Sequence, residues 1–152
     1  MPKSKLPKAY ENAPPLFEGR KIDLYAVDHK EFVIHPGAVV ILPLISESEV
    51  VMIKNRRFVV DETLWELPAG TLEPREKPIE TAHREIIEEI GYEAKEMIPL
   101  CEFFTTPGFC NEKIYAFAAK GLTEVGQNLD PDERITPEIL KWDTLLAMIR
   151  NG

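Results

Sequence analysis

The chain has 152 residues, of which 44% are hydrophobic and 29% are charged. This length and composition are typical of one soluble globular domain and exclude a disordered or fibrous protein. The formal net charge of −8 argues against electrostatic binding to a nucleic-acid backbone, so we expect no nucleic-acid partner.

Membrane and secretory signals are absent from the sequence. The longest apolar run, 38–45, is much shorter than the roughly 20 residues of a membrane-spanning helix, and we expect no membrane partner. The N-terminal residues lack the apolar stretch of a signal peptide. Because only two cysteines are present and no Cys-x-x-Cys motif occurs, we expect no disulfide scaffold or structural zinc site, and a cytoplasmic protein.

The N-terminal third combines a proline-rich start with several strand patterns. Prolines at four of the first fifteen positions favour a loose arm, which we place at residues 1–17. Residues 20–27 and 31–35 are expected to form an antiparallel strand pair joined by a short hairpin link. The apolar run 39–42 is typical of a strand that is buried on both faces. Further strands are expected at 50–54 and 64–68.

The clearest predicted helix covers residues 78–90. It begins with a proline, which suits a first helical turn, and Gly91 follows as the C-terminal stop. At 100° per residue, the apolar residues Ile79, Ala82, Ile86 and Ile90 form one narrow stripe along it. This stripe is the predicted core-facing side of the helix.

The remaining sequence predicts two more strands and a second helix. The strands are expected at 99–104 and 113–119, followed by an acidic loop at 128–133. A closing amphipathic helix is expected from Asp143, with Leu146 and Ile149 turned toward the core. Since strands outnumber helices, a mixed β-sheet covered by helices is the most economical architecture.

Three glutamates share the side of the predicted helix that lies opposite its apolar stripe. Glu85, Glu88 and Glu89 fall within an arc of about 100°, and neighbours three or four residues apart have β-carbons roughly 5–6 Å from each other. One interpretation is a solvated acidic face, softened by Arg84. The other is a cluster of hard oxygen ligands for Mg²⁺ or Mn²⁺.

The residues from Gly70 to Tyr92 resemble the signature of the Nudix hydrolases, G-x5-E-x7-R-E-U-x-E-E-x-G-U, in which U is a bulky apolar residue. The matching fixed positions are Gly70, Glu76, Arg84, Glu85, Glu88, Glu89 and Gly91, whereas Tyr92 is aromatic where an aliphatic residue is usual. The resemblance implies an α/β Nudix fold, with a mixed β-sheet sandwiched between helices (α/β/α) and an N-terminal antiparallel strand pair. We expect a single domain over 18–152, with the Nudix box at 70–92.

The resemblance also implies a metal site. In this family, the glutamates that match Glu85 and Glu89, the main-chain oxygen that matches Ala69, and often the glutamate that matches Glu88 bind divalent cations. We therefore expect Mg²⁺ or Mn²⁺ at these four residues. An acidic protein needs such cations to receive a negatively charged diphosphate, and a bound cation can lower the pKa of an attacking water.

Two further residues of the box have expected structural roles. Gly70 is expected to allow a tight turn that brings the Ala69 carbonyl toward the helix. Glu76 is expected to pair with Arg84 and so to fix the preceding loop on the helix; a favourable charge near the helix N-terminus is a compatible alternative.

Other stretches resemble the ADP-ribose pyrophosphatase branch of the family. These are 64–70 before the box, Pro107 fifteen residues beyond its end, and 106–113, which is similar to Ser-Pro-Gly-Phe-Thr-Asp-Glu-Lys except that Cys110 replaces threonine. The branch implies substrate contacts from Arg57, Glu66, Pro107 and Phe109, and a catalytic role for Glu112 together with Glu85 and Glu89. An ordinary turn at Pro107 and a loop-closing role for Phe109 stay open as alternatives.

The branch further implies a substrate and an assembly. We expect a small-molecule nucleotide substrate, ADP-ribose, cleaved to AMP and ribose 5-phosphate. The alternatives are another nucleoside diphosphate sugar, a dinucleoside polyphosphate or a modified nucleotide, or a module that binds ADP-ribose without cleaving it. Members of the branch are usually homodimers with exchanged N-terminal strands, and residues 18–36 are the candidates for that exchange.

Overall fold

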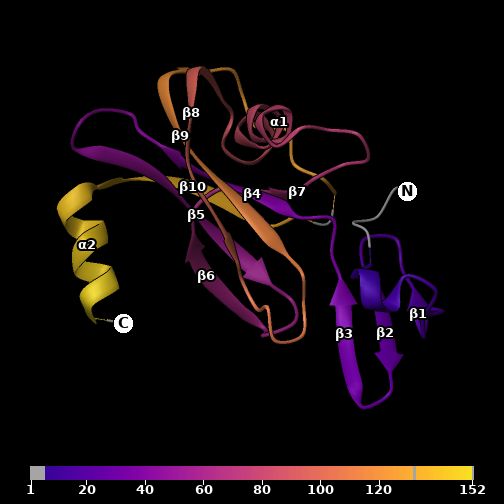
Figure 1. Cartoon of the computed structure of the whole chain (residues 1–152). Coiled ribbons are helices and arrows are strands. Elements are labelled where there is room, and N and C mark those ends of the chain that lie inside the picture. Colours follow the sequence, from indigo (N-terminus) through magenta and orange to yellow (C-terminus); the bar gives the residue numbers. More distant parts are fainter. Residues whose placement is uncertain (1–5, 132, 152) are drawn as a thin grey trace.

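The computed structural model describes residues 6–131 and 133–151, so the first five residues of the expected arm lie outside the described part of the chain. Figure 1 shows how the elements are arranged. In chain order they are the 3-10 helix η1 (Lys8–Tyr10), the strands β1 (Phe17–Glu18), β2 (Asp23–Val27), β3 (Lys30–Ile34), β4 (Ala38–Pro43), β5 (Glu49–Arg57), β6 (Glu62–Glu66) and β7 (Ala69–Thr71), the helix α1 (Pro78–Ile90), the strands β8 (Tyr92–Phe104), β9 (Lys113–Glu124) and β10 (Ile135–Lys141), and the helix α2 (Trp142–Asn151).

The described strands form three sheets. The mixed sheet has the order β7-β4-β9-β8, in which β4 pairs parallel with β9 and antiparallel with β7. An antiparallel sheet has the order β10-β5-β6, and β1, β2 and β3 form the third. Helix α1 packs against the mixed sheet and α2 against β10. This arrangement confirms the expected α/β class, with the strands divided between sheets where the sequence suggested one.

Helix α1 begins and ends where the sequence predicts. A proline occupies its first turn, and Gly91 ends it with a φ of 74°, a left-handed conformation that glycine adopts without a steric cost. Ala82, Ile86 and Ile90 are buried in the core, whereas Ile79 in the first turn is 40% exposed. Burial of this stripe fixes the rotation of α1 and so decides where its glutamates point.

Strands β8 and β10 differ markedly from the prediction. Strand β10 has no predicted counterpart, because Pro137 and the charged residues Glu138 and Lys141 obscure its pattern, yet it pairs along its whole length with β5, with Pro137 opposite Ile53. Strand β8 begins at Tyr92 instead of residue 99, directly after the end of α1. The existence of β10 and the early start of β8 both depend on long-range pairing with neighbouring strands, which local propensity does not reveal.

Helix α2 covers a small second core. Leu145 is buried there against Val50 and Met52, whereas Leu146 is half-buried and Ile149 is 70% exposed, so the expected inward position of Ile149 is wrong. The helix begins at Trp142, one residue before the expected start. Across residues 6–131 and 133–151, neither helix has the length and apolar character that crossing a membrane requires.

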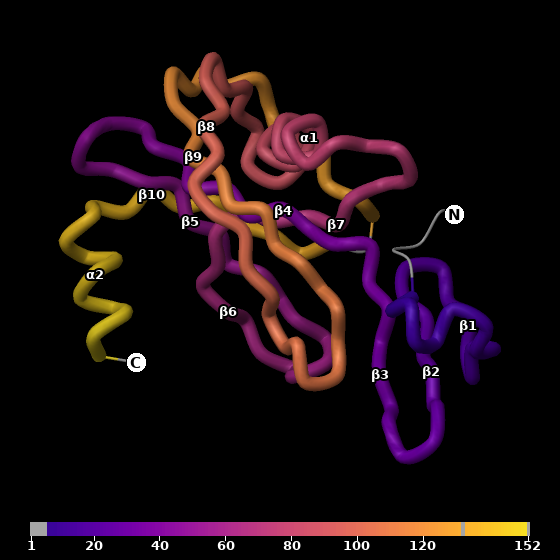
Figure 2. The backbone as a smooth tube through the Cα atoms, viewed as in Figure 1, coloured from indigo at the N-terminus to yellow at the C-terminus, as the bar shows by residue number. Residues whose placement is uncertain are grey.

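The predicted N-terminal strand pair is β2 and β3, and the two-residue β1 extends it. Figures 1 and 2 show this sheet to one side of the other two, next to the end of the long β8–β9 hairpin. The Val33 N–H donates to the Phe109 carbonyl (2.7 Å), and the Asn111 N–H donates to the Val33 carbonyl (3.3 Å). These bonds join β3 to the 105–112 connection of the hairpin.

Candidate functional site

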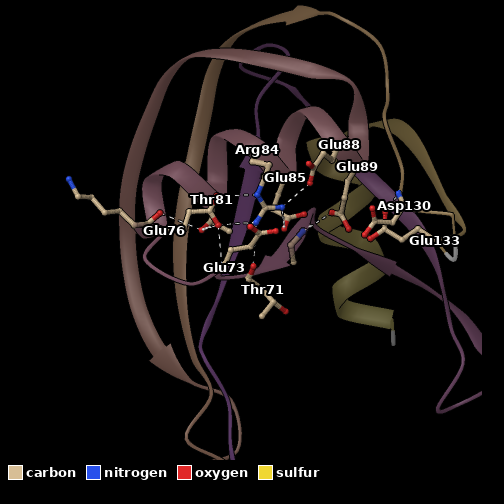
Figure 3. Close-up of polar contacts among 12 residues, drawn as sticks. Thr71, Glu73, Glu76, Thr81, Arg84, Glu85, Glu88, Glu89, Asp130 and Glu133 are labelled. Carbon is tan, nitrogen blue, oxygen red and sulfur yellow. Dashed lines mark hydrogen bonds and ion pairs between the residues drawn. The ribbon is translucent and has the colours of Figure 1, made fainter. Parts of the chain in front are cut away.

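A cavity of about 1490 Å³ lies between α1, the start of β7, the ends of β5 and β6, and the segment before β10. Six of the expected metal-binding, catalytic and substrate-binding residues line it. They are Arg57, Glu66, Ala69, Glu85, Glu88 and Glu89. These residues come from four separate elements, β5, β6, β7 and α1, and folding brings them to the same cavity. Figure 3 shows the three glutamates of α1 with their polar neighbours.

Arg84 organises the carboxylates of α1. Its Nη1 donates to Glu85 Oε1 (2.7 Å) and to Glu88 Oε2 (2.8 Å), and its Nε donates to Glu76 Oε1 (3.0 Å) (Figure 3). The expected Glu76–Arg84 pair is therefore confirmed. The hydrogen bond to Glu76 raises the pKa of Arg84 well above its usual range, and the same bond lowers the pKa of Glu76.

Glu85 and Glu89 are buried, although both carry carboxylates. Burial raises the pKa of Glu85, and it raises the pKa of Glu89 to about 8, because both side chains lose the water that would solvate their charge. The Ala69 N–H donates to Glu89 Oε2 (2.8 Å) and opposes part of this shift. The interpretation of the three glutamates as a solvated face is wrong for these two residues.

Gly70 lies inside strand β7, so the tight turn expected at this glycine is not present. The structure gives another reason for a glycine here. A β-carbon at position 70 would lie 1.8 Å from Glu85 Oε1 and 1.8 Å from Glu85 Cδ. The missing side chain therefore leaves the space that the Glu85 carboxylate occupies.

The expected metal ligands fit a divalent cation by their chemistry. Glu85, Glu88, Glu89 and the main chain of Ala69 supply hard oxygen atoms, and a cation would compensate the buried charges of Glu85 and Glu89. In the described part of the chain, however, no group of three His, Cys, Asp or Glu side chains is arranged as ligands of one ion. Arg84 contacts Glu85 and Glu88 instead. Each of these contacts uses one carboxylate oxygen of the glutamate.

Arg57 and Glu66, two of the expected substrate-binding residues, form an ion pair with each other. Arg57 Nε donates to Glu66 Oε1 (2.7 Å), and Arg57 Nη2 donates to Glu66 Oε2 (2.6 Å). The hydrogen bond to Glu66 raises the pKa of Arg57, and the charges of Glu89 and Glu112 raise it further. Arg57 thus lies within the electrostatic reach of both the α1 carboxylates and Glu112.

Pro107, Phe109 and Glu112 do not line the large cavity with the α1 carboxylates. Pro107 and Phe109 line a smaller, mainly apolar cavity of about 280 Å³ between β3 and the end of the β8–β9 hairpin. The Thr105 hydroxyl donates to Glu112 Oε2 (2.7 Å), and His35 Nε2 lies 3.6 Å from Glu112 Oε1. These three residues are therefore brought together near β3, separately from the predicted metal ligands.

The large cavity is also lined by two acidic residues of the loop predicted at 128–133. Figure 3 shows Asp130 and Glu133 beside Glu89. The charge of Glu133 contributes to the raised pKa of both Glu85 and Glu89, after the larger effect of their burial. The available sequence signal was the acidic composition of 128–133, which does not by itself indicate what a loop faces.

Comparisons with known proteins show which family the chain belongs to. The NUDIX domain family matches residues 34–150. An ADP-ribose pyrophosphatase from Bacillus subtilis (strain 168) is 40% identical over 147 residues, which covers 90% of this chain and 80% of the relative. A methanol dehydrogenase activator from Bacillus methanolicus is 38% identical over 146 residues, covering 89% of this chain and 79% of the relative.

A solved structure supports the fold independently. The crystal structure of an ADP compounds hydrolase matches with a TM-score of 0.75 at 19% identity, over 91% of this chain and 80% of that one. This likeness concerns the arrangement of the elements, and the sequence match above concerns the residues. The NUDIX match over 34–150 and the 40% identity to the ADP-ribose pyrophosphatase show that the chain belongs to the NUDIX domain family.

Proposed function

We propose that this protein is a divalent-metal-dependent hydrolase that cleaves the diphosphate of ADP-ribose to give AMP and ribose 5-phosphate. One observation carries the proposal. The buried carboxylates of Glu85 and Glu89 share a cavity with the cationic Arg57, in a chain that is 40% identical to an ADP-ribose pyrophosphatase. A small-molecule nucleotide with a charged diphosphate is the substrate class that suits such a cavity.

The proposed metal is Mg²⁺ or Mn²⁺, held by Glu85, Glu88, Glu89 and the Ala69 carbonyl. When bound, such a cation neutralises charge on the diphosphate and lowers the pKa of a bound water. Gly70 supports this assignment because it leaves room for the Glu85 carboxylate. Arg84 supports it because its bonds to Glu85 and Glu88 hold these carboxylates together on one side of α1.

Arg57 is the proposed contact for the substrate phosphates. A guanidinium has five N–H donors, and the two bonds to Glu66 leave three of them for other acceptors. Glu66 therefore orients Arg57 at the edge of the cavity without using all its donors. Pro107 and Phe109 are the proposed contacts for other parts of the substrate, from the side of the 105–112 connection.

Hydrolysis adds a water oxygen to one phosphorus, breaks the bond from that phosphorus to the bridging oxygen, and needs a base that takes the water proton. Glu112 is one proposed base, acting with Glu85 and Glu89; because it does not line their cavity, this role requires the 105–112 connection to approach α1. Glu133 is a second candidate, since it already lines the cavity with Glu85 and Glu89.

We also propose a homodimer with exchanged N-terminal strands as the active form. Phe17 on β1 is 60% exposed, and Phe58 and Val59 at the β5–β6 turn are 89% and 80% exposed; all three line the large cavity. Burial of these side chains against a second copy would remove apolar surface from water. Residues 18–152 are proposed as the single domain, residues 1–17 as its arm, and the cytoplasm as its location.

The experiment that tests the function is turnover of a substrate panel with product identification. It compares ADP-ribose with other nucleoside diphosphate sugars, dinucleoside polyphosphates and modified nucleotides, with Mg²⁺, with Mn²⁺ and with a chelator. The two similar relatives are named for different functions, so the panel decides the substrate. Metal-dependent release of AMP and ribose 5-phosphate supports the proposal, whereas tight ADP-ribose binding without turnover supports a binding module and overturns it.

A further inference from the structure

Gln127 lies where the segment after β9 passes close to the end of α1. A β-carbon on Gly91, the residue that ends α1, would lie 2.7 Å from the Gln127 nitrogen and 2.8 Å from the Gly126 carbonyl carbon. The glycine therefore lets the segment after β9 cross directly over the end of the helix. A helix end at this position presents its last carbonyls to whatever crosses it.

The crossing segment binds those carbonyls one after another. The N–H groups of Val125 and Gly126 donate to the Gly91 carbonyl (2.8 and 3.1 Å). The side-chain amide of Gln127 donates to the Glu89 carbonyl, and the Asn128 N–H donates to the Glu88 carbonyl (3.1 Å). The main chains of Glu88 and Glu89, two of the proposed metal ligands, are thus bonded to this segment.

Residues 128–131, 133 and 134 are called the acidic loop below. The Gln127 amide has a second acceptor on the other side of this loop. Its Nε2 also donates to the Ile135 carbonyl (3.4 Å), where β10 begins. One side chain therefore joins both ends of the acidic loop to the last turn of α1. Within the loop, the Asp130 N–H donates to Glu133 Oε2 (3.0 Å), and the Glu133 N–H donates to the Asp130 carbonyl (3.0 Å).

We propose that Gln127 is a positioning residue that sets the placement of Glu133 opposite Glu85 and Glu89. Its amide ties the base of the acidic loop to the main chain of Glu89, and the internal turn of the loop carries Glu133 into the cavity. Gln127 touches neither the cavity nor the substrate in this role. The inference rests on the proposed function because it assigns Glu133 a part in that hydrolysis.

The decisive variant is Gln127→Met, which keeps the length of the side chain and removes the amide donor. The matched control is Asn128→Ala, since Asn128 contacts α1 through its main chain. With ADP-ribose and Mg²⁺, we expect Gln127→Met to lower kcat by about 10-fold with KM changed by less than about threefold. We expect Asn128→Ala to stay within about twofold of the unmodified protein.

A double-mutant cycle separates positioning from general destabilisation. If Gln127 acts through Glu133, Gln127→Met has less than about a twofold effect in a Glu133→Gln background. An equal loss of rate in both backgrounds, or a single variant within about twofold of the unmodified protein, overturns the proposal. If Gln127→Met unfolds, Gln127→Glu, which keeps the shape but loses the donor, replaces it in the cycle.

A measurement without turnover distinguishes failure of this inference from failure of the proposed function. Hydrogen exchange of the peptide covering 128–135 is expected to rise in Gln127→Met while exchange within 78–90 stays unchanged. If the unmodified protein does not hydrolyse ADP-ribose, the proposed function fails, and the exchange experiment still decides whether Gln127 anchors the loop. Unchanged exchange at 128–135 overturns the anchoring role.

Discussion

The Glu85 carboxylate occupies the space in which a side chain on Gly70 would begin, since a β-carbon there would lie 1.8 Å from Glu85 Oε1. Gly70 and Glu85 are fifteen positions apart in the box, and the missing side chain of the first leaves room for the carboxylate of the second. Gly70 belongs to β7, Glu85 belongs to α1, and the contact sets how closely the helix approaches the strand. The glycine acts here through the space that it leaves and not through an unusual backbone conformation.

The first prediction concerns this contact. Gly70→Ala is expected to displace the Glu85 carboxylate and to lower kcat by about 100-fold or more, because a displacement of the order of 1 Å at a reacting centre is costly. Steady-state hydrolysis of ADP-ribose measures the effect. Gly108→Ala is the control for folding stability, since a β-carbon there would meet nothing within 4 Å. Full activity of Gly70→Ala would contradict the role assigned to this space.

The second prediction concerns the proposed metal ligands. Glu85→Gln and Glu89→Gln are each expected to abolish turnover while the fold is retained, because an amide keeps the volume of the carboxylate but is a poor ligand for a hard cation. Turnover at saturating Mg²⁺ measures activity, calorimetric titration of Mg²⁺ measures cation binding, and far-ultraviolet circular dichroism measures retention of the fold. A wild-type rate in either variant would show that the ligand assignment is incorrect.

The third prediction follows from the buried charge of Glu89. Burial raises the pKa of Glu89 to about 8 in the folded protein, above the ordinary value of 4.5. The folded state therefore holds this proton more tightly than the unfolded state, and its stability falls as pH rises from about 4.5 toward 8. Glu89→Gln removes this loss, so in the presence of a chelator it is expected to stabilise the protein at pH 8.

Urea unfolding of the metal-free protein at pH 5 and pH 8 measures this effect. At pH 5 the Glu89 side chain is neutral in the folded protein, so the substitution is expected to change the free energy of unfolding much less than at pH 8. Glu112→Gln serves as a comparison because this carboxylate lies outside the large cavity. A Glu89→Gln variant that is less stable than the unmodified protein at pH 8 would refute the prediction.

The fourth prediction concerns Arg84. Arg84→Lys is expected to lower the free energy of unfolding by about 1–3 kcal/mol, because a single ammonium group cannot reproduce the fork of bonds to Glu76, Glu85 and Glu88. Chemical unfolding measures this loss. Arg56→Lys is the matched control, since Arg56 pairs with the exposed Asp61 on the surface, where ion pairs contribute little. Equal effects in the two variants would argue against the role of Arg84 as an organising centre.

The fifth prediction distinguishes the two candidate bases. A side chain that takes the proton of the attacking water contributes roughly 10²- to 10⁴-fold to the rate. Glu112→Gln and Glu133→Gln are compared at saturating metal over a range of pH. We expect the variant of the true base to lose its rate by this factor and to lose the acidic limb of the pH profile. The other variant is expected to lose less, which assigns it to positioning.

The elements and residues that the sequence predicts well are those governed by local geometry. Helix α1 from Pro78 to Ile90, its end at Gly91, and the adjacency of its glutamates follow from 3.6 residues per turn and from the conformational freedom of glycine. The Glu76–Arg84 pair is also local, because it joins a helix to the loop directly before it. Such features need no information about the rest of the chain.

Other features depend on which distant segments meet. Strand β10 exists because β5 pairs with it, and Glu133 faces Glu89 because that pairing and the Gln127 contacts carry its loop across the end of α1. The burial of Glu85 and Glu89 likewise requires β7 to lie against the helix. No periodicity along the chain encodes these contacts, since each is a balance of packing, pairing and desolvation between segments far apart in sequence. The amino-acid order therefore identifies the chemistry that the helix carries, and the assembled fold decides which charges are buried beside it.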